Sequence, residues 1–162
     1  LVILLYQSFS GILYTGIVLL TAFFMAGAAA GAFATVKHER WGKSALKPIH
    51  LGFILLAAAP ALWAALLRSF NVVSLSGSLP FFLIAGCGGL LTGAYYGIVV
   101  RTAFPESGGY VPAVFYAWDV LGACAGGVLG GVILFPAIGL AGTALCIALT
   151  HALALALIAG RW

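Results

Sequence analysis

Apolar segments long enough to cross a lipid bilayer dominate this sequence. A transmembrane helix needs about 20 mainly apolar residues to cross a hydrocarbon core of about 30 Å. Five such segments follow one another here, at about residues 11–36, 48–67, 79–100, 111–135 and 138–159. Only 6% of the 162 residues are charged, whereas a soluble domain has about 25%. We therefore expect a single all-α integral membrane domain of five transmembrane helices, embedded in the lipid bilayer.

The loop after the first segment predicts the orientation of the chain. This loop, "VKHERWGKSALK", contains Glu39 and Gly42 among the basic residues Lys37, Arg40, Lys43 and Lys47. Short loops rich in Lys and Arg stay in the cytoplasm, so alternation places the N-terminus outside and the C-terminus in the cytoplasm. The formal net charge of +4 lies mainly in this loop and fits membrane orientation, so no nucleic-acid partner is expected.

Glycines recur every four residues in several segments and predict close helix packing. Small residues at this spacing form a smooth strip on one helix face, where two backbones can approach in lipid. We expect these strips to pack within the chain, with an oligomer contact or a substrate path as the alternatives. The rows are Gly122, Gly126 and Gly130; Gly127 and Gly131; Gly89, Gly93 and Gly97; and Gly27 with Gly31.

Asp119 is the acidic residue that lies deepest in an apolar segment. It stands about eight residues, or about 12 Å, from the cytoplasmic end of its helix, where ionisable groups are usually paired or line a polar cavity. The short connection 136–139 makes the last two segments an antiparallel hairpin, so Asp119 and His151 are expected at similar depth. We expect them to pair, with Tyr116 and Tyr95 as further hydrogen-bond partners. A backbone cap by Asp119 and a proton or substrate relay are the alternatives.

No pattern of metal, haem or catalytic residues emerges from the sequence. His50 is expected near the cytoplasmic surface and His151 deeper, which disfavours haem ligation by the two histidines. Cys87, Cys124 and Cys146 stand singly in apolar segments, as buried structural thiols do. We therefore expect no cofactor, no metal site and no catalytic residue in this chain.

Two long stretches resemble the membrane part of the fused major-facilitator and spermidine-synthase-like proteins of bacteria. They are "LLTAFFMAGAAAGAFA" at 19–34 and "YVPAVFYAWDVLGACAGGVLGGVILFPAIGL" at 110–140, with "GCGGLLTGAYYG" at 86–97 between them. The loop core "ERWGK" at 39–43 is similar to a cytoplasmic loop motif of major-facilitator transporters. The resemblance implies a bacterial inner-membrane protein with a major-facilitator-like half-bundle, in which Asp119 is the family's aspartate of the fourth helix.

Three functions follow from the residues and the resemblance. The first is a non-catalytic anchor or scaffold, packed against other membrane subunits or a missing domain of the same polypeptide. The second is half of a small-solute transporter, for example for a cationic amine, with Asp119 as counter-charge. The third is a membrane part that serves a synthase domain elsewhere on the polypeptide. Because Glu39, Glu106 and Asp119 are its only acidic residues, we do not expect the chain to catalyse aminopropyl transfer alone. It begins without methionine and ends directly after an apolar segment, so we expect a processed chain or a piece of a longer one.

Overall fold

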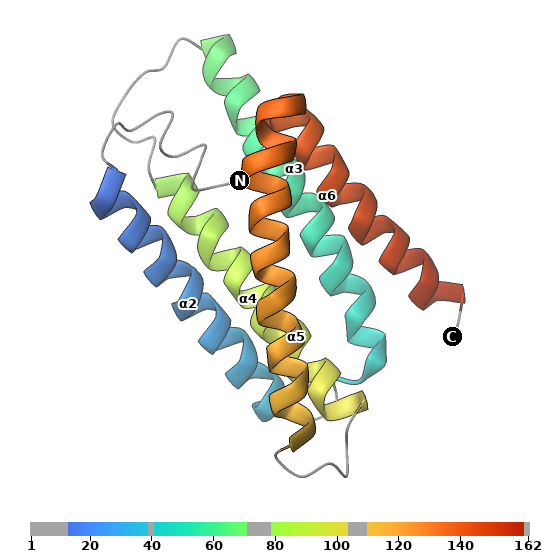
Figure 1. Ribbon diagram of the computed structural model, residues 1–162. Helices are drawn as coiled ribbons and strands as arrows, with labels where there is room; N and C mark the ends of the chain where they lie inside the picture. The colour runs from blue at the N-terminus through green and yellow to red at the C-terminus, as the bar shows by residue number, and fades with distance from the viewer. Residues whose placement is uncertain (1–12, 39–40, 71–78, 104–109, 161–162) are drawn as a thin grey trace.

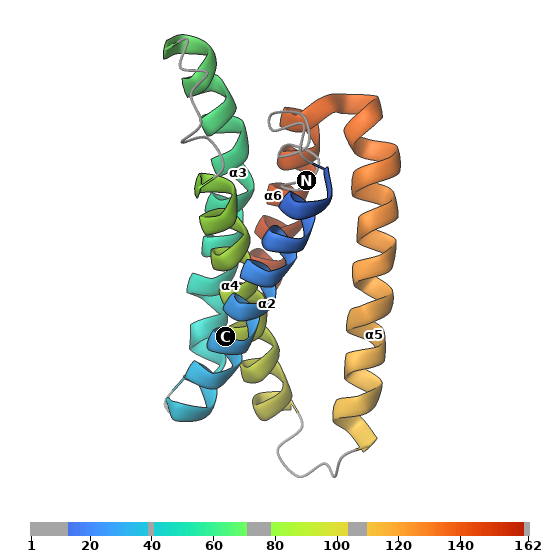
Figure 2. The ribbon, with the colours of Figure 1, turned by 90° about the vertical axis from the view of Figure 1, so that its left-hand side faces the viewer.

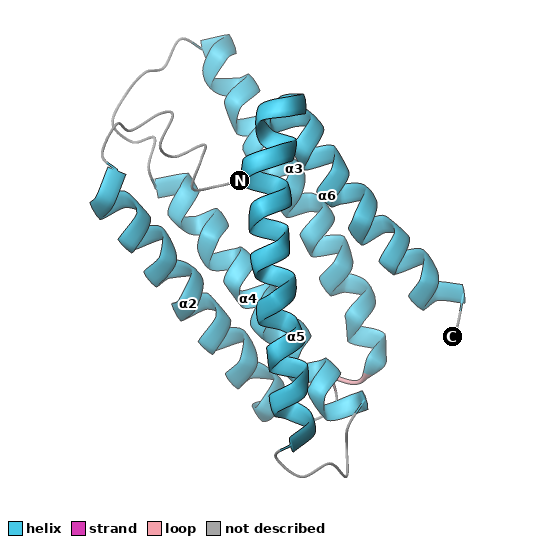
Figure 3. Cartoon of the chain, viewed as in Figure 1, coloured by secondary structure: helices cyan, strands magenta, loops and turns pink. Residues whose placement is uncertain are grey.

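The described part of the chain is built of helices. The computed structural model describes residues 13–38, 41–70, 79–103 and 110–160, and no strand occurs in these ranges (Figure 3). The expected all-α fold is therefore confirmed. The elements are α2 (Leu13–Lys37), the 3-10 turn η1 (Lys43–Ala45), α3 (Leu46–Phe70), α4 (Leu79–Ala103), α5 (Tyr110–Gly127), the π-helical segment η3 (Val128–Leu134) and α6 (Phe135–Gly160).

Three described stretches are long and apolar enough to cross a membrane. They are Gly16–Lys37, Leu79–Thr102 and Ala113–Gly160, and the described part of α3 adds a shorter apolar stretch at Leu46–Ala59. Large apolar side chains point outward from these helices; Phe33, for example, is 70% exposed. A contiguous apolar surface of this kind suits contact with lipid rather than water.

The chain reverses direction at Gly139, inside the range of α6. Pro136 lies just before this reversal, where η3 runs into α6 without a break. Gly139 has φ 69° and ψ −174°, a conformation that favours glycine because it has no Cβ. The Thr143 hydroxyl then donates to the Gly139 carbonyl oxygen at 2.8 Å. Figure 2 shows the result, with α5 and α6 running in opposite directions.

Four helices form a row in the order α2, α4, α3 and α6, and α5 crosses in front of it (Figure 1). Two clusters of buried side chains hold this row together. Leu20, Phe81 and Ala85 join α2 to α4, and Leu140 of α6 packs against them. Ile49, Ala94 and Ile98 join α3 to α4. Helix α4 is therefore the central element of the row.

Helices α2 and α4 touch through their backbones, which is the most extensive contact between any two described helices. A Cβ atom added at Gly89 or Gly93 of α4 overlaps a carbonyl oxygen of α2, that of Phe24 or of Ala28. In the other direction, a Cβ added at Gly27 overlaps the Gly86 carbonyl oxygen. Gly31 meets Leu90 in the same way, and Gly97 meets the Thr35 hydroxyl. The rows at Gly27 and Gly89 thus pack within the chain.

The glycine rows of α5 have no such neighbour. A Cβ added at Gly122, Gly126, Gly127 or Gly130 meets nothing within 4 Å among the described residues, while Gly131 is partly buried. Figure 2 shows α5 standing apart from α2, α3 and α4, and its one substantial backbone contact in the described structure is with η3, which follows it in the chain. The intramolecular packing expected of these four glycines is therefore not seen, because α5 meets α4 through the ring of Phe115 on Tyr96 and not through its glycines.

The two kinds of glycine row predict opposite responses to the same substitution. We expect Gly89→Leu to lower the free energy of unfolding by at least about 1–3 kcal/mol, because α2 has to move away from a backbone contact. The matched variant Gly126→Leu should leave the isolated chain as stable as before. Reversible unfolding in mixed detergent micelles measures both. Equal losses in the two variants would contradict the packing of α2 on α4.

Candidate functional site

Two histidines far apart in the sequence meet at the contact between α3 and α6. The Nδ1 atoms of His50 and His151 lie 3.2 Å apart, a hydrogen-bond distance, and the ring centroids are 5.5 Å apart. His50 is only 5% exposed, and His151 is partly buried. Nitrogen atoms at this distance attract only if one carries a hydrogen and the other offers a lone pair. The pair therefore contains one donor and one acceptor.

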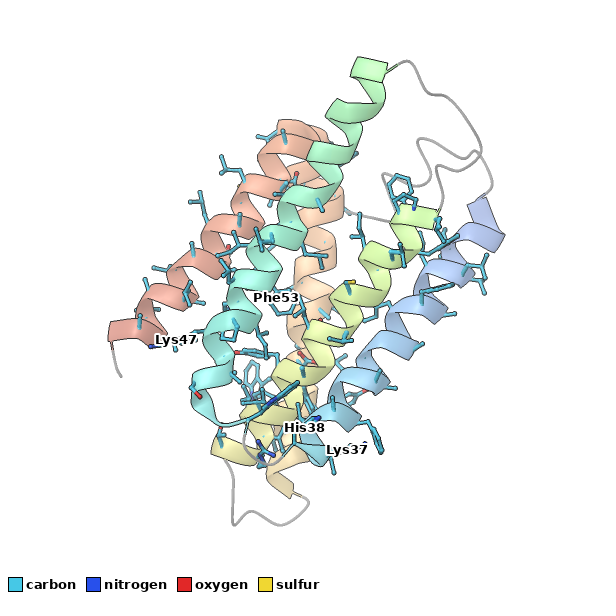
Figure 4. All side chains as sticks on the ribbon, turned by 180° about the vertical axis from the view of Figure 1, so that it is seen from behind. Lys37, His38, Lys47 and Phe53 are labelled. Carbon is cyan, nitrogen blue, oxygen red and sulfur yellow. The ribbon has the colours of Figure 1, made fainter. Side chains whose placement is uncertain are left out.

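Aromatic side chains surround the pair. The Phe53 ring, one turn after His50 on α3, stacks on His151 with centroids 4.6 Å apart and planes 11° apart. The Tyr95 ring of α4 meets His50 edge-on at 5.4 Å. Figure 4 shows Phe53 among the side chains between the helices. These contacts fix both imidazoles in an apolar setting, where a hydrogen bond is stronger than in water.

One nitrogen of this pair is left without a partner. His50 Nε2 is buried and makes no hydrogen bond with any described residue. A buried polar atom in this state costs free energy and calls for an explanation. His50 therefore belongs to the candidate site, although the sequence analysis expected it near the cytoplasmic surface.

The expected pair of Asp119 and His151 is not formed, because His151 has another partner. His151 binds His50, and Asp119 is exposed on α5, with no hydrogen bond or ion pair to a described residue. Asp119 does lie within electrostatic reach of Tyr95, one of its expected partners. Tyr116, the other expected partner, is 60% exposed. The expected pair is missing because α5 stands away from α6 along the length that carries Asp119.

The two histidines touch, whereas the sequence predicts different depths for them. Counting residues from the end of each helix assumes that all helices end in one plane and share one tilt. Helices α3 and α6 instead pack so that the two rings touch. A sequence signal for His50 was present: the apolar residues Ile49 and Phe53 follow the same buried side of α3. This pattern indicates a core position.

The donor set of the pair limits the groups that it can hold. A haem iron between two histidines would have to sit between their ring nitrogens, but the two Nδ1 atoms are already in hydrogen-bond contact. Metal sites in proteins usually have three or more protein ligands. Within the described ranges, no group of three His, Cys, Asp or Glu side chains is placed to hold an ion.

The basic loop is fastened to the end of α4 by Arg101. Its Nη1 donates to the Thr35 carbonyl oxygen of α2 at 2.9 Å, and its Nη2 donates to the Trp41 carbonyl oxygen. Trp41 also stacks on His38, with centroids 5.4 Å apart. Arginine near a helix C-terminus satisfies carbonyl groups that have no partner within the helix. These two hydrogen bonds of Arg101 therefore fix the path of the chain from α2 toward α3.

The other expected loop residues lie at the same end of the bundle as Arg101. Lys37 and Lys47 are exposed at the same end of the bundle (Figure 4). Gly42 has open space around it, and Lys43 begins the turn η1. Glu39 and Arg40 lie outside the described residues. Comparisons of the chain with models of protein families, with curated proteins and with solved structures gave no match.

The histidine pair predicts a non-additive pair of substitutions. His151→Phe keeps an aromatic ring but leaves both nitrogens of buried His50 without a partner, which costs about 1–3 kcal/mol. We expect the double variant, with His50→Phe and His151→Phe together, to lose less stability than the two single variants summed. The difference should be about 1 kcal/mol or more. Unfolding in mixed micelles measures the four proteins of this cycle. Additive losses would show that the two rings do not interact, and exposed His38→Phe is the matched control.

Proposed function

We propose that this chain is a non-catalytic anchor or scaffold domain in a larger assembly of the bacterial inner membrane. The observation that carries this proposal is the glycine face of α5, on the side of the helix where Phe115 meets Tyr96 of α4. Gly122, Gly126, Gly127 and Gly130 meet open space there, and exposed Asp119 lies on the same helix. A bundle that met only lipid on all sides would have little use for this face.

Energetics favour a protein partner on α5 over lipid. A charged side chain at the centre of a bilayer costs about 2.5–3.5 kcal/mol on insertion scales. Glycines that face lipid also give up the close backbone contact that drives helix association in membranes. Another membrane helix packed on α5 removes both costs if it has small residues at the same spacing and a hydrogen-bond donor near Asp119. It belongs to another subunit or to a further domain of the same polypeptide.

The proposal includes five membrane crossings, made by α2, α3, α4, α5 with η3, and α6. It places the N-terminus outside and the C-terminus in the cytoplasm. In support, Lys37 and Lys47 lie at one end of the bundle, with Arg101 close to the same loop (Figure 4), and basic residues mark the cytoplasmic side. The resemblance to the membrane part of spermidine-synthase-like proteins and to a major-facilitator-like half-bundle belongs to the same proposal. A synthase domain elsewhere on the polypeptide fits it too.

A transporter half is the second candidate function, and one observation favours it. Polar side chains from three helices meet, namely His50 of α3, Tyr95 of α4 and His151 of α6, and Asp119 of α5 acts electrostatically on Tyr95. Transporter sites form where several helices contribute polar groups near the middle of the membrane. In this function, Asp119 is the counter-charge for a cationic solute such as an amine.

A photo-crosslinking amino acid tests the anchor. Placed at Leu129, 53% exposed and three residues after Gly126, it should form a discrete cross-link to another polypeptide in native membranes. Placed at Leu153, 63% exposed on α6, it should label lipid only. Gly126→Leu should abolish the protein cross-link at Leu129 without unfolding the chain. If both positions label only lipid, while Asp119→Asn stops amine uptake, the transporter half is the better account.

The proposed topology predicts which positions a membrane-impermeant thiol reagent reaches. In a variant without its native cysteines, Lys43→Cys should react only after the cytoplasmic face is opened, and Asn71→Cys should react in intact cells. Labelling of both positions from the same side would contradict the five crossings and the orientation. Ser44→Cys, next to Lys43, is the control for local effects of the substitution.

A further inference from the structure

The geometry of the histidine pair determines where its hydrogens lie. If His50 accepted the shared hydrogen at Nδ1, its own hydrogen would sit on Nε2, where no described residue can receive it. Buried N–H groups without an acceptor are rare. We therefore assign the donor role to His50: its Nδ1–H points to His151 Nδ1, and His151 keeps its own hydrogen on Nε2. His50 Nε2 is then a buried, unused lone pair.

In this assignment one nitrogen of the neutral pair, His50 Nε2, is still free to bind a hydrogen. We propose that the His50–His151 pair is a proton-binding site between the helices, which takes up one excess proton per chain. The proton forms a bond with His50 Nε2, and the resulting N–H has no acceptor among the described residues, so we expect the uptake at the acid end of the titration. The bridging hydrogen can then leave His50 Nδ1 and bond to His151 Nδ1, so the positive charge passes from one ring to the other. Each step makes one N–H bond, and the total of hydrogens on the pair rises from two to three.

A second excess proton does not fit the pair. It would put a hydrogen on both Nδ1 atoms, which face each other at 3.2 Å. It would also place two positive rings side by side away from water, where like charges strongly disfavour ionisation. Closely coupled groups take up protons as a unit rather than as independent residues. The site is therefore expected to bind one proton and exclude the second.

Asp119 of α5 is the one acidic residue in the described ranges, and it acts on Tyr95, whose ring meets His50, but on neither imidazole. The charge of one proton on the pair is therefore shared between the two rings and is not balanced by a carboxylate in contact with them. The other ionisable groups on the helices around the pair do not compensate it. Arg101 of α4 is bound to two carbonyl oxygens, Cys146 of α6 carries a free thiol, and Lys47 is exposed at the start of α3.

Nitrogen NMR of the histidines tests this proposal directly. The full chain, labelled with ¹⁵N-histidine and placed in phosphatidylcholine vesicles, is titrated from about pH 8 to about pH 4, a range that includes the ordinary protonation of histidine. We expect coupling between two Nδ1 atoms at high pH and an uptake of one proton by the pair. Uptake of two protons by the pair, uptake of none, or absence of the Nδ1–Nδ1 coupling would each overturn the proposal.

Variants separate the parts of the site. His38→Gln should leave the coupled signal unchanged. His151→Phe should remove both the coupling and the uptake by the pair. Asp119→Asn should leave the coupling and the uptake unchanged, because Asp119 acts on neither imidazole. Since the main measurement uses the unmodified protein, it holds even if His151→Phe does not fold.

Discussion

In a bilayer, helices gain little from burying apolar side chains, because the lipid tails are equally apolar. What holds this chain together is the backbone contact between α2 and α4, in which glycines of each helix meet carbonyl groups of the other. The other interactions are built on this pair. Helix α4 brings Ala94 and Ile98 against α3, Tyr95 against His50, and Arg101 against the end of α2. The histidine contact then ties α6 to α3.

The two ends of the row therefore use different interactions. Between α2 and α4 the contact is close, continuous and made mainly of backbone groups, with Arg101, which keeps its charge at any pH near neutral, at one end. Between α3 and α6 the polar contact is a single hydrogen bond between two titratable rings, flanked by the stacked Phe53. The strength of glycine packing does not depend on pH, whereas that of an imidazole pair does. Any response of this domain to acidity is thus expected at the α3–α6 contact and not at the α2–α4 contact.

The sequence predicts the helical class well because hydrophobicity and helix length depend only on local composition. It also marks the reversal near Pro136 and Gly139 through residues with fixed conformational preferences. It does not predict which glycine row packs within the chain, because the rows at Gly89 and Gly122 have the same spacing and differ only in what lies opposite them. For the same reason the partner of His151 could not be predicted. That choice depends on how α3 and α6 cross and on the distance of α5 from α6, which are properties of the assembled bundle.

The π-helical segment after α5 has a consequence for the shape of the glycine row. In an α-helix with 3.6 residues per turn, a step of four residues overshoots one turn, so a row with this spacing winds slowly around the helix. In a π-helix, where residue i bonds to residue i+5, the same step falls short of one turn. The row from Gly122 through Gly126 to Gly130 passes from α5 into η3. The two deviations oppose each other, so the row winds less around the axis than it would in an uninterrupted α-helix, and a neighbouring helix can follow it over a longer distance.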